Sequence, residues 1–431
     1  MSKESLLTAH HSADVNQNTR GQLTGKPACS VSVFKEHLYL TATYSHKDNS
    51  HDYSRILRFN PKIDSWEELY EASLANSTEK TSRQEPLKLS FKLNTLTNRH
   101  YIYSEMVVFK GKSNASPALY VSVLSSAGAK TLRSEDGITF DEVPQARLEY
   151  PEGMFFRPLV TFQDRVYASA LKRVTDEELS WKSVPLIYIS DEPTLGDWQE
   201  VNLPGFDDSN NQSISPLTVF NNYLYAATIN QERGFQIWKA QVSNQSPYTW
   251  EQVISNGAHK YTQNQLISSM VVFKGNLYVA SGMLMPSDEQ TDELRTAPPE
   301  LIRIYIDDSW DLIAGTPRFT PHGLKVPLSG MGPGFDDLNT SAFSCMFTHN
   351  ERLYLGVQKL DTFQVWMSED GEIWTQPFQA KLSNYSNAAF CTGMSTSLGI
   401  VLVFKTASPQ NLDDTPSNGN EDDGLEVWID N

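Results

Sequence analysis

The chain is short of cysteine, of basic residues and of long apolar runs, and each shortage argues against a class of protein. Its 431 residues include three cysteines, an odd and low number that argues against a disulfide framework and suits a reducing compartment. No stretch approaches the roughly 20 apolar residues of a membrane helix, and residues 1–21 lack the apolar core of a signal peptide. We therefore expect a soluble, cytoplasmic protein with no membrane partner.

Basic residues number 35 against 52 acidic ones, so the formal net charge is −17. This balance disfavours a broad face of clustered Lys and Arg, and we expect no nucleic-acid partner. Solubility is the simplest explanation of the acidic excess, and a cation site or a basic partner is the alternative. Charged residues make up 20% and aromatic residues 11%, a composition typical of a globular protein.

Segments with helical periodicity are also lacking, and a repeat takes their place. A short apolar run is followed by Phe-x-x-x-Leu-Tyr, or a close variant, and then by more apolar residues. Six copies, two of them with insertions, occur at 34–39, 109–120, 162–167, 220–225, 273–278 and 347–354. A degenerate seventh begins near Met394 and Leu398.

Each copy of the repeat predicts a β-hairpin. Phe ends one strand, a polar turn such as Lys110–Gly111, Asn221–Asn222 or Lys274–Gly275 follows, and Leu-Tyr opens the next strand. Gly and Asn suit such a turn because they tolerate the positive φ that it requires.

Two further strands follow each hairpin. A third strand is clearest at 235–238, 363–366 and 425–428, with weaker copies at 56–59, 131–133, 186–188 and 301–305. A fourth element brings one aromatic residue in six units: Trp66, Phe140, Trp198, Trp250, Trp310 and Trp374. Four short strands per unit of roughly 50–60 residues are typical of a β-propeller.

Seven hairpins predict an all-β, seven-bladed β-propeller with four-stranded blades, which occupies residues 1–431 as a single domain. The expected blades lie at 28–70, 100–145, 154–202, 213–254, 266–314, 341–378 and 388–431. Blade seven lacks an outer strand of its own, so the N-terminal segment 1–27 is predicted to supply the closing strand and remove an open sheet edge. We expect the polar stretches 71–98, 284–299 and 411–423 to be loops inserted in the repeat.

The motif Ser-Glu-Asp-Gly-x-x-aromatic occurs twice, at Ser134–Phe140 and Ser368–Trp374. It resembles the Asp-box turn of sialidase-like propellers, although it is one residue shorter before the glycine. The resemblance implies a structural hairpin in which the Asp side chain caps its own turn, and a catalytic role is the alternative.

Candidate site residues lie in the loops that enter the first strand of each blade, since the innermost strands of a propeller line its channel. Two such loops match, Pro204–Asn211 and Pro333–Asn339, and both contain Gly-Phe-Asp-Asp. Asp207 and Asp336 would then point at the channel mouth, towards a ligand or a hard cation such as calcium, which prefers carboxylate and amide oxygens. The alternative is a repeated turn in which Asp and Asn bind backbone N–H groups.

Catalytic and ligand-binding roles can be assigned to these loops as hypotheses. We predict that Asp207, Asp336 or Glu105 acts as a general base, and that Arg157 or Tyr103 holds an anion or a leaving group. A structural salt bridge is the alternative role for Arg157. The predicted ligand-binding residues are Asn210, Asn264, Asn339 and Tyr385.

Motifs for metals and cofactors are missing from the sequence, and no cofactor is evident. The nine histidines show no zinc-binding spacing, no glycine-rich phosphate loop is found, and no partner base is marked for Cys29, Cys345 or Cys391. We therefore expect the cysteines to be small buried apolar residues. Calcium is the one metal that the sequence leaves open.

Units 219–228, 234–238 and 367–374 resemble a broad group of bacterial β-propellers with Asp-box-like turns. The chain is also similar to the propeller domain of cyanobacterial alkyl-halide alkylating enzymes, which carry a calcium-binding β-roll before the propeller. No glycine- and aspartate-rich nonapeptides of that kind are present in this sequence. The first resemblance implies the fold, and the second implies an alkylation.

Three functions follow as hypotheses. The leading one is a small-molecule site at the channel mouth, because the seven units have diverged and the rim mixes Tyr, Asp, Asn, Arg and Glu with apolar residues. Such a site could belong to an enzyme of secondary metabolism, a transferase or a hydrolase. A non-catalytic scaffold that binds a protein partner is the second hypothesis, and lectin-like carbohydrate binding is the third.

Overall fold

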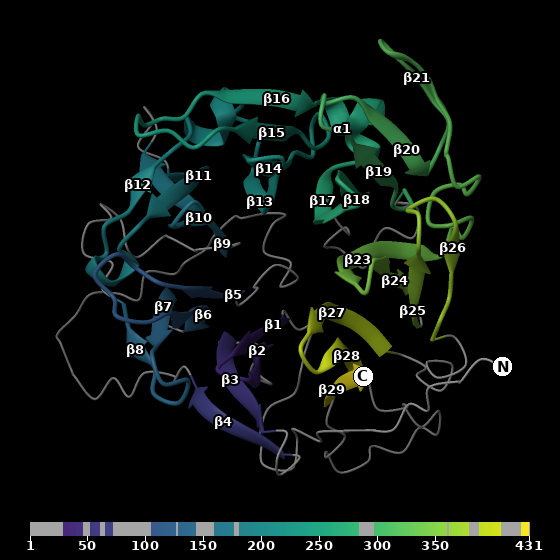
Figure 1. The fold of residues 1–431 in the computed structure, drawn as a ribbon. Helices are drawn as coiled ribbons and strands as arrows, with labels where there is room; N and C mark the ends of the chain where they lie inside the picture. The colour runs from purple at the N-terminus through teal and green to yellow at the C-terminus, as the bar shows by residue number, and fades with distance from the viewer. Residues whose placement is uncertain are drawn as a thin grey trace, which may run out of the picture.

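A computed structural model describes residues 29–45, 52–60, 65–71, 105–125, 128–143, 159–175, 181–283, 297–359, 362–378, 388–406 and 424–430. These residues form eight antiparallel sheets, of which seven are arranged as the blades of a ring and the eighth is a separate two-stranded hairpin (Figure 1). In each blade the strands pair in the order in which they follow along the chain, so every blade is a meander.

The strands of the first four blades have the following bounds. Blade one consists of β1 (Cys29–Phe34), β2 (His37–Ser45), β3 (Asp52–Asn60) and β4 (Ser65–Glu71). Blade two consists of β5 (Glu105–Phe109), β6 (Ala118–Ser125), β7 (Gly128–Ser134) and β8 (Asp141–Glu142). Blade three consists of β9 (Leu159–Phe162), β10 (Arg165–Thr175), β11 (Trp181–Ser190) and β12 (Gln199–Glu200). Blade four consists of β13 (Ser213–Phe220), β14 (Tyr223–Ile229), β15 (Ile237–Ala240) and β16 (Trp250–Ile254).

Blades five to seven complete the ring. Blade five consists of β17 (Leu266–Phe273), β18 (Asn276–Gly282), β19 (Leu301–Ile304) and β20 (Trp310–Ala314). Blade six consists of β23 (Thr340–His349), β24 (Arg352–Lys359), β25 (Phe363–Ser368) and β26 (Trp374–Thr375). Blade seven consists of β27 (Ala388–Thr396), β28 (Gly399–Thr406) and β29 (Gly424–Asp430).

The first strands of the blades are the innermost ones and contact one another around the centre. β1 contacts β5, β5 contacts β9, and the series continues through β13, β17, β23 and β27 back to β1. Figure 1 shows these seven labels around the middle of the ring. The predicted seven-bladed, all-β propeller is therefore confirmed.

Several sequence predictions concern residues outside the described ranges. Blade seven has three strands among the described residues, and the segment 1–27, which was predicted to supply its fourth, lies outside them. The same holds for 72–98, 284–296 and 411–423, which make up most of the expected loop insertions. The closing strand therefore stays a prediction.

The two-residue turns of the hairpins have the geometry that the repeat predicts. Both central residues have positive φ at Lys35–Glu36, Gln163–Asp164, Asn221–Asn222, Lys274–Gly275 and Asn350–Glu351. Such turns match the twist of the strands that they join. The turns of blades one and three contain neither Gly nor Asn. The twist of the two strands therefore outweighs the preference of the turn residues for negative φ.

Two insertions in the repeat are accommodated differently. In blade two, Lys110–Gly111 does not form a tight turn, because β5 ends at Phe109 and β6 begins only at Ala118. That prediction was wrong for blade two. In blade six the turn is still two residues long, and the extra residues lengthen β23 beyond Phe347.

The Phe and Tyr of the repeat form an aromatic pair in six blades, and in several of them the Tyr hydroxyl reaches the neighbouring blade. Tyr39 of blade one donates to the Gly137 carbonyl oxygen of blade two, at 2.9 Å. Tyr225 of blade four donates to Asp308 Oδ1 of blade five, at 3.3 Å. Both acceptors lie in the connection between the third and fourth strands, so one position of the repeat joins consecutive blades.

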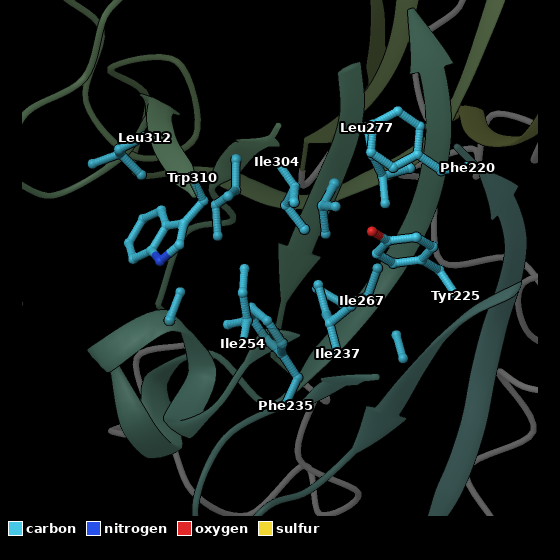
Figure 2. Close-up of a cluster of buried hydrophobic side chains, with 14 residues drawn as sticks. Phe220, Tyr225, Phe235, Ile237, Ile254, Ile267, Leu277, Ile304, Trp310 and Leu312 are labelled. Carbon is cyan, nitrogen blue, oxygen red and sulfur yellow. The ribbon is translucent and has the colours of Figure 1, made fainter. Parts of the chain in front are cut away.

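Apolar packing fills the space between blades. Figure 2 shows one such cluster, in which Tyr225, Phe235 and Ile237 of blade four lie with Ile304 and Trp310 of blade five. All five side chains are buried. Removal of this apolar surface from water is the main force that holds neighbouring blades together.

Helical structure is limited to single turns in the described residues. These are α1 (Asn256–His259) and the 3₁₀ turns η4 (Pro193–Leu195), η5 (Pro204–Asp207) and η6 (Tyr261–Gln263). No helix in the described part of the chain is long and apolar enough to cross a membrane. The sequence did not predict the hairpin of β21 (Arg318–Thr320) and β22 (Gly323–Lys325), which lies between blades five and six.

The contact between Tyr278 and the turn of the next blade predicts a difference between two glycines of similar conformation. Gly371 and Gly275 have φ of +85° and +73°, but a Cβ on Gly371 would lie 1.9 Å from the Tyr278 hydroxyl oxygen, whereas nothing lies within 4 Å of one on Gly275. We expect Gly371→Ala to lower the free energy of unfolding by roughly 1–3 kcal/mol more than Gly275→Ala. Denaturant unfolding measures both variants, and equal losses would contradict the inter-blade contact.

Candidate ligand-binding site

Three loops that enter blades four, five and six share one unusual backbone turn. Three consecutive residues have left-handed φ: 57°, 57° and 63° at Gly205–Asp207, 57°, 55° and 64° at Gly257–His259, and 65°, 58° and 61° at Gly334–Asp336. Left-handed conformation costs a non-glycine residue roughly 1–2 kcal/mol, so surrounding contacts must stabilise each turn. The Gly-Phe-Asp-Asp repeat of the sequence marks two of the three turns.

The first residue of the turn is held by a side chain that follows six or seven residues later. The carbonyl oxygens of Gly205, Gly257 and Gly334 accept hydrogen bonds from Asn211 Nδ2 at 2.8 Å, Asn264 Nδ2 at 3.2 Å and Thr340 Oγ1 at 2.8 Å. The repetition of this bond identifies the turn as part of the architecture.

The middle residue of the turn is buried between aromatic side chains in two of the loops. The ring of Phe206 lies 5.0 Å from that of Trp238 and 4.9 Å from that of Trp250, measured between centroids. Phe335 packs in the same way on Trp366, at 4.8 Å. The third residue of the turn is therefore the one presented outwards, and it is Asp207, His259 or Asp336.

The acidic residues of the two Gly-Phe-Asp-Asp loops have distinct surroundings. Asp207 and Asp336 are exposed, and Asp336 Oδ1 accepts a hydrogen bond from the Gly332 N–H at 2.7 Å. The second acid of each pair binds its own loop, since the N–H groups of Asn210 and Asn339 each donate to Oδ1 of the Asp two residues earlier, at 2.9 Å. The catalytic roles of Asp207 and Asp336 and the ligand roles of Asn210 and Asn339 stay predictions.

The turn of blade five differs in chemistry from the other two. Ala258 replaces Phe, and His259 followed by Lys260 replaces the two acids. The Ala258 carbonyl oxygen accepts a hydrogen bond from Arg318 Nε at 2.8 Å, so the same turn positions a cation from the β21 hairpin. The loop thus changes from an acidic to a basic surface.

A pocket of about 420 Å³ opens beside this turn, between the loops that enter blades five and six. Its lining consists of basic and polar side chains, namely His259, Lys260, Tyr261, Thr262, Gln263, Thr316 and Arg318. This volume is within the range of small-molecule sites.

Buried Glu300 binds two of the basic side chains that line the pocket. Its side chain is 0% exposed and lies 3.1 Å from Lys260 Nζ and 3.0 Å from Arg318 Nη1. It also accepts hydrogen bonds from Asn264 Nδ2 at 3.2 Å and from the Thr316 N–H at 2.8 Å. These contacts satisfy the buried carboxylate and fix the two basic side chains beside the pocket.

The electrostatics of the pocket favour an anion. Two basic side chains, Lys260 and Arg318, flank the one carboxylate of Glu300, and burial together with the charges of Arg318 and His322 lowers the pKa of His259. Arg318 Nη2 is buried and has no hydrogen-bond partner among the described residues. Because an unpaired buried guanidinium N–H is costly, this atom needs an acceptor.

The remaining sequence-predicted residues are distributed as follows. Asn264 is buried beneath the pocket, where it supports Gly257 and Glu300, and Glu105 is half-buried at the start of β5. Arg157, Tyr103 and Tyr385 lie outside the described residues. Asn264 was selected from the sequence of this loop, but Lys260, Glu300 and Arg318 were missed as a set. The sequence signal for this set is the pair of adjacent basic residues His259 and Lys260.

Other candidate chemistry has a structural explanation. In the turn at Ser134–Phe140, Asp136 Oδ1 accepts hydrogen bonds from the N–H groups of Ile138 at 2.7 Å and Thr139 at 2.8 Å, which lower the pKa of its carboxyl. Asp370 binds its own turn in the same way. Burial raises the pKa of the Cys345 thiol to about 12, which disfavours a nucleophilic thiolate.

Metal ligands do not gather in the described residues. No group of three or more His, Cys, Asp or Glu side chains that could hold a metal ion occurs among them. Calcium binding therefore stays a prediction without a described set of ligands.

The chain is similar to known proteins in its fold. No family model and no curated protein sequence matches it. A puromycin-hydrolysing peptidase of Mycobacterium tuberculosis is similar over 98% of this chain and 55% of its own, with 10% identity and a TM-score of 0.52. The polysaccharide lyase Uly1 is similar over 97% of this chain and 94% of its own, with 10% identity and a TM-score of 0.51.

A third similar structure is itself a propeller. The β-propeller domain of the Trilobed protease from Pyrococcus furiosus covers 94% of this chain, with 7% identity and a TM-score of 0.45. The chain spans about half of the length of the Mycobacterium tuberculosis peptidase that it matches. At these identities the likeness shows the fold alone.

Substitutions at adjacent residues of the repeated turn should differ in their effect on stability. We expect Phe206→Ala and Phe335→Ala to destabilise the protein by roughly 3–5 kcal/mol each, because both rings are buried between tryptophans. Asp207→Asn and Asp336→Asn should each change the free energy of unfolding by less than about 1 kcal/mol, since both side chains are exposed. Thermal and denaturant unfolding of the four variants measures these losses. Asp variants that lost as much stability as the Phe variants would contradict the architectural role of the turn.

Proposed function

We propose that this propeller binds a small molecule carrying an oxyanion, a carboxylate or a phosphate, in the pocket between the loops that enter blades five and six. The observation that carries the proposal is the Arg318 side chain, which is 10% exposed and lines the pocket, and whose buried Nη2 has no hydrogen-bond partner among the described residues. An oxyanion would supply the missing acceptor through a charge-assisted hydrogen bond.

The local charge supports this ligand class despite the acidity of the whole chain. Glu300 offsets one of the two cations, so one positive charge is left for a ligand. Exposed charges that lie beyond about 8 Å are largely screened at physiological ionic strength, so the net charge of −17 does not by itself decide which ion the pocket binds. Thr262, Gln263 and Thr316 add hydrogen-bonding groups around the same space.

This proposal keeps the small-molecule hypothesis and moves the site away from the channel axis. The pocket lies beside α1, which Figure 1 shows at the periphery of the ring and outside β17. A catalytic base at Asp207, Asp336 or Glu105, an alkylation and a cytoplasmic location are separate hypotheses, and no described contact supports one of them over the others.

Isothermal titration of the full chain with inorganic phosphate, and separately with acetate, tests the proposal at ionic strength matched with chloride. We expect binding of at least one of the two anions. Arg318→Lys keeps the charge towards Glu300 but loses the second guanidinium nitrogen, and should weaken binding by roughly tenfold or more.

The matched control is Arg352→Lys, since Arg352 is paired with Glu369 in blade six and does not line the pocket. It should leave anion binding unchanged. Absence of binding by both anions, or equal binding by the Arg318→Lys variant and the wild type, would overturn the proposal.

A further inference from the structure

The β21–β22 hairpin has an unusual distribution of polar and apolar side chains. Phe319 pairs with Leu324 across the hairpin, and Arg318 pairs with Lys325. Because paired residues point to the same side of a two-stranded sheet and neighbours alternate, the two apolar residues share one face and the two cations share the other. Figure 1 shows β21 projecting outwards from the ring.

The cationic face is turned towards the propeller. The guanidinium of Arg318 lies 5.7 Å from the centroid of the Trp310 ring, and Lys325 Nζ lies 5.1 Å from it. Lys325 also forms an ion pair with Asp311 at 3.3 Å, and Arg318 reaches Glu300. These contacts fix the hairpin on blade five through its charged side.

The apolar face is turned to solvent. Phe319 is 83% exposed and Leu324 is 54% exposed, and Val326, just after the hairpin, is 48% exposed. On a surface that contacts only water we would expect the opposite arrangement, with the charged side chains exposed and the apolar ones covered. Exposed apolar residues held together on a fixed element mark an interaction surface.

The charge of the chain indicates which kind of partner this surface can bind. Residues 312–335 contain no Asp or Glu, in a chain with a net charge of −17. The hairpin therefore brings no carboxylate of its own to a contact between two copies, whereas an approach over acidic surfaces would add to their repulsion. Depletion of charged residues is also the signature of the centre of a protein–protein interface.

The hairpin forms a sheet of its own. β21 and β22 pair only with each other among the described strands. A second hairpin could pack its apolar face on the first around a two-fold axis, so that each Phe319 lies against the other copy. Beyond the proposed ligand site, we propose that the β21–β22 hairpin is the contact through which two copies of this chain associate.

This association has a characteristic salt dependence. The contact is apolar and the two bodies are both strongly acidic, so screening should strengthen the dimer as salt increases. A contact with an acidic partner through Arg318 and Lys325 would weaken with salt.

Sedimentation equilibrium of the full chain, at about 0.05 M and about 0.5 M sodium chloride, tests the proposal. We expect a monomer–dimer equilibrium that is tighter at the higher concentration of salt. Phe319→Asp should raise the dimer dissociation constant by roughly tenfold or more, because it puts a carboxylate at the centre of the contact. Its melting temperature should not change, since the side chain is exposed.

The matched control is Ile373→Asp, which also replaces an exposed apolar residue, 72% exposed, by a carboxylate, but in the turn of blade six. It should leave the dissociation constant unchanged. A monomer at both salt concentrations, an association that weakens with salt, or a dimer that Phe319→Asp leaves intact would each overturn the proposal.

Discussion

The register between neighbouring blades depends on a repeated contact: in blades one, three and four a tyrosine hydroxyl reaches the connection between the third and fourth strands of the next blade. Tyr39 reaches the backbone of Gly137, Tyr167 lies 3.3 Å from the Tyr248 hydroxyl, and Tyr225 reaches Asp308. Burial is the main cause that raises the pKa of these hydroxyls, so each remains a neutral donor inside the ring. Because every such bond crosses a blade boundary, it sets the spacing of the blades around which the apolar clusters pack.

A rigid ring allows its entering loops to differ without loss of the fold. The same left-handed turn carries Phe206 and Asp207 in blade four, Ala258 and His259 in blade five, and Phe335 and Asp336 in blade six. In blades four and six the middle residue fills an aromatic cluster. In blade five the middle residue is the small Ala258, whose carbonyl oxygen accepts a hydrogen bond from Arg318, and the third residue is the basic His259. One scaffold therefore presents carboxylates in two blades and a basic pocket in the blade between them.

The fold was predictable because its signals are local and repeated. Phe34 and Tyr39 lie five residues apart in one hairpin, and the aromatic residue of the fourth strand recurs at Trp66, Trp250 and Trp374. The pocket was not predictable in the same way, because Lys260, Glu300 and Arg318 come from separate segments that meet only in the folded ring. Asn264 was identified as a polar residue of an entering loop, but its burial beneath Glu300 depends on tertiary packing. The β21–β22 hairpin was missed because its strands are three residues long, too short for alternation to be recognised.

The proposed ligand site depends on Arg318 Nη2, which has no hydrogen-bond partner among the described residues. The most direct measurement is a crystal structure of the full chain grown with inorganic phosphate and in the absence of other oxyanions. We expect a phosphate in the pocket beside His259 and Lys260, with one oxygen within hydrogen-bonding distance of Arg318 Nη2. A protein carbonyl or carboxylate bonded to Nη2, with no phosphate in the pocket, would contradict it.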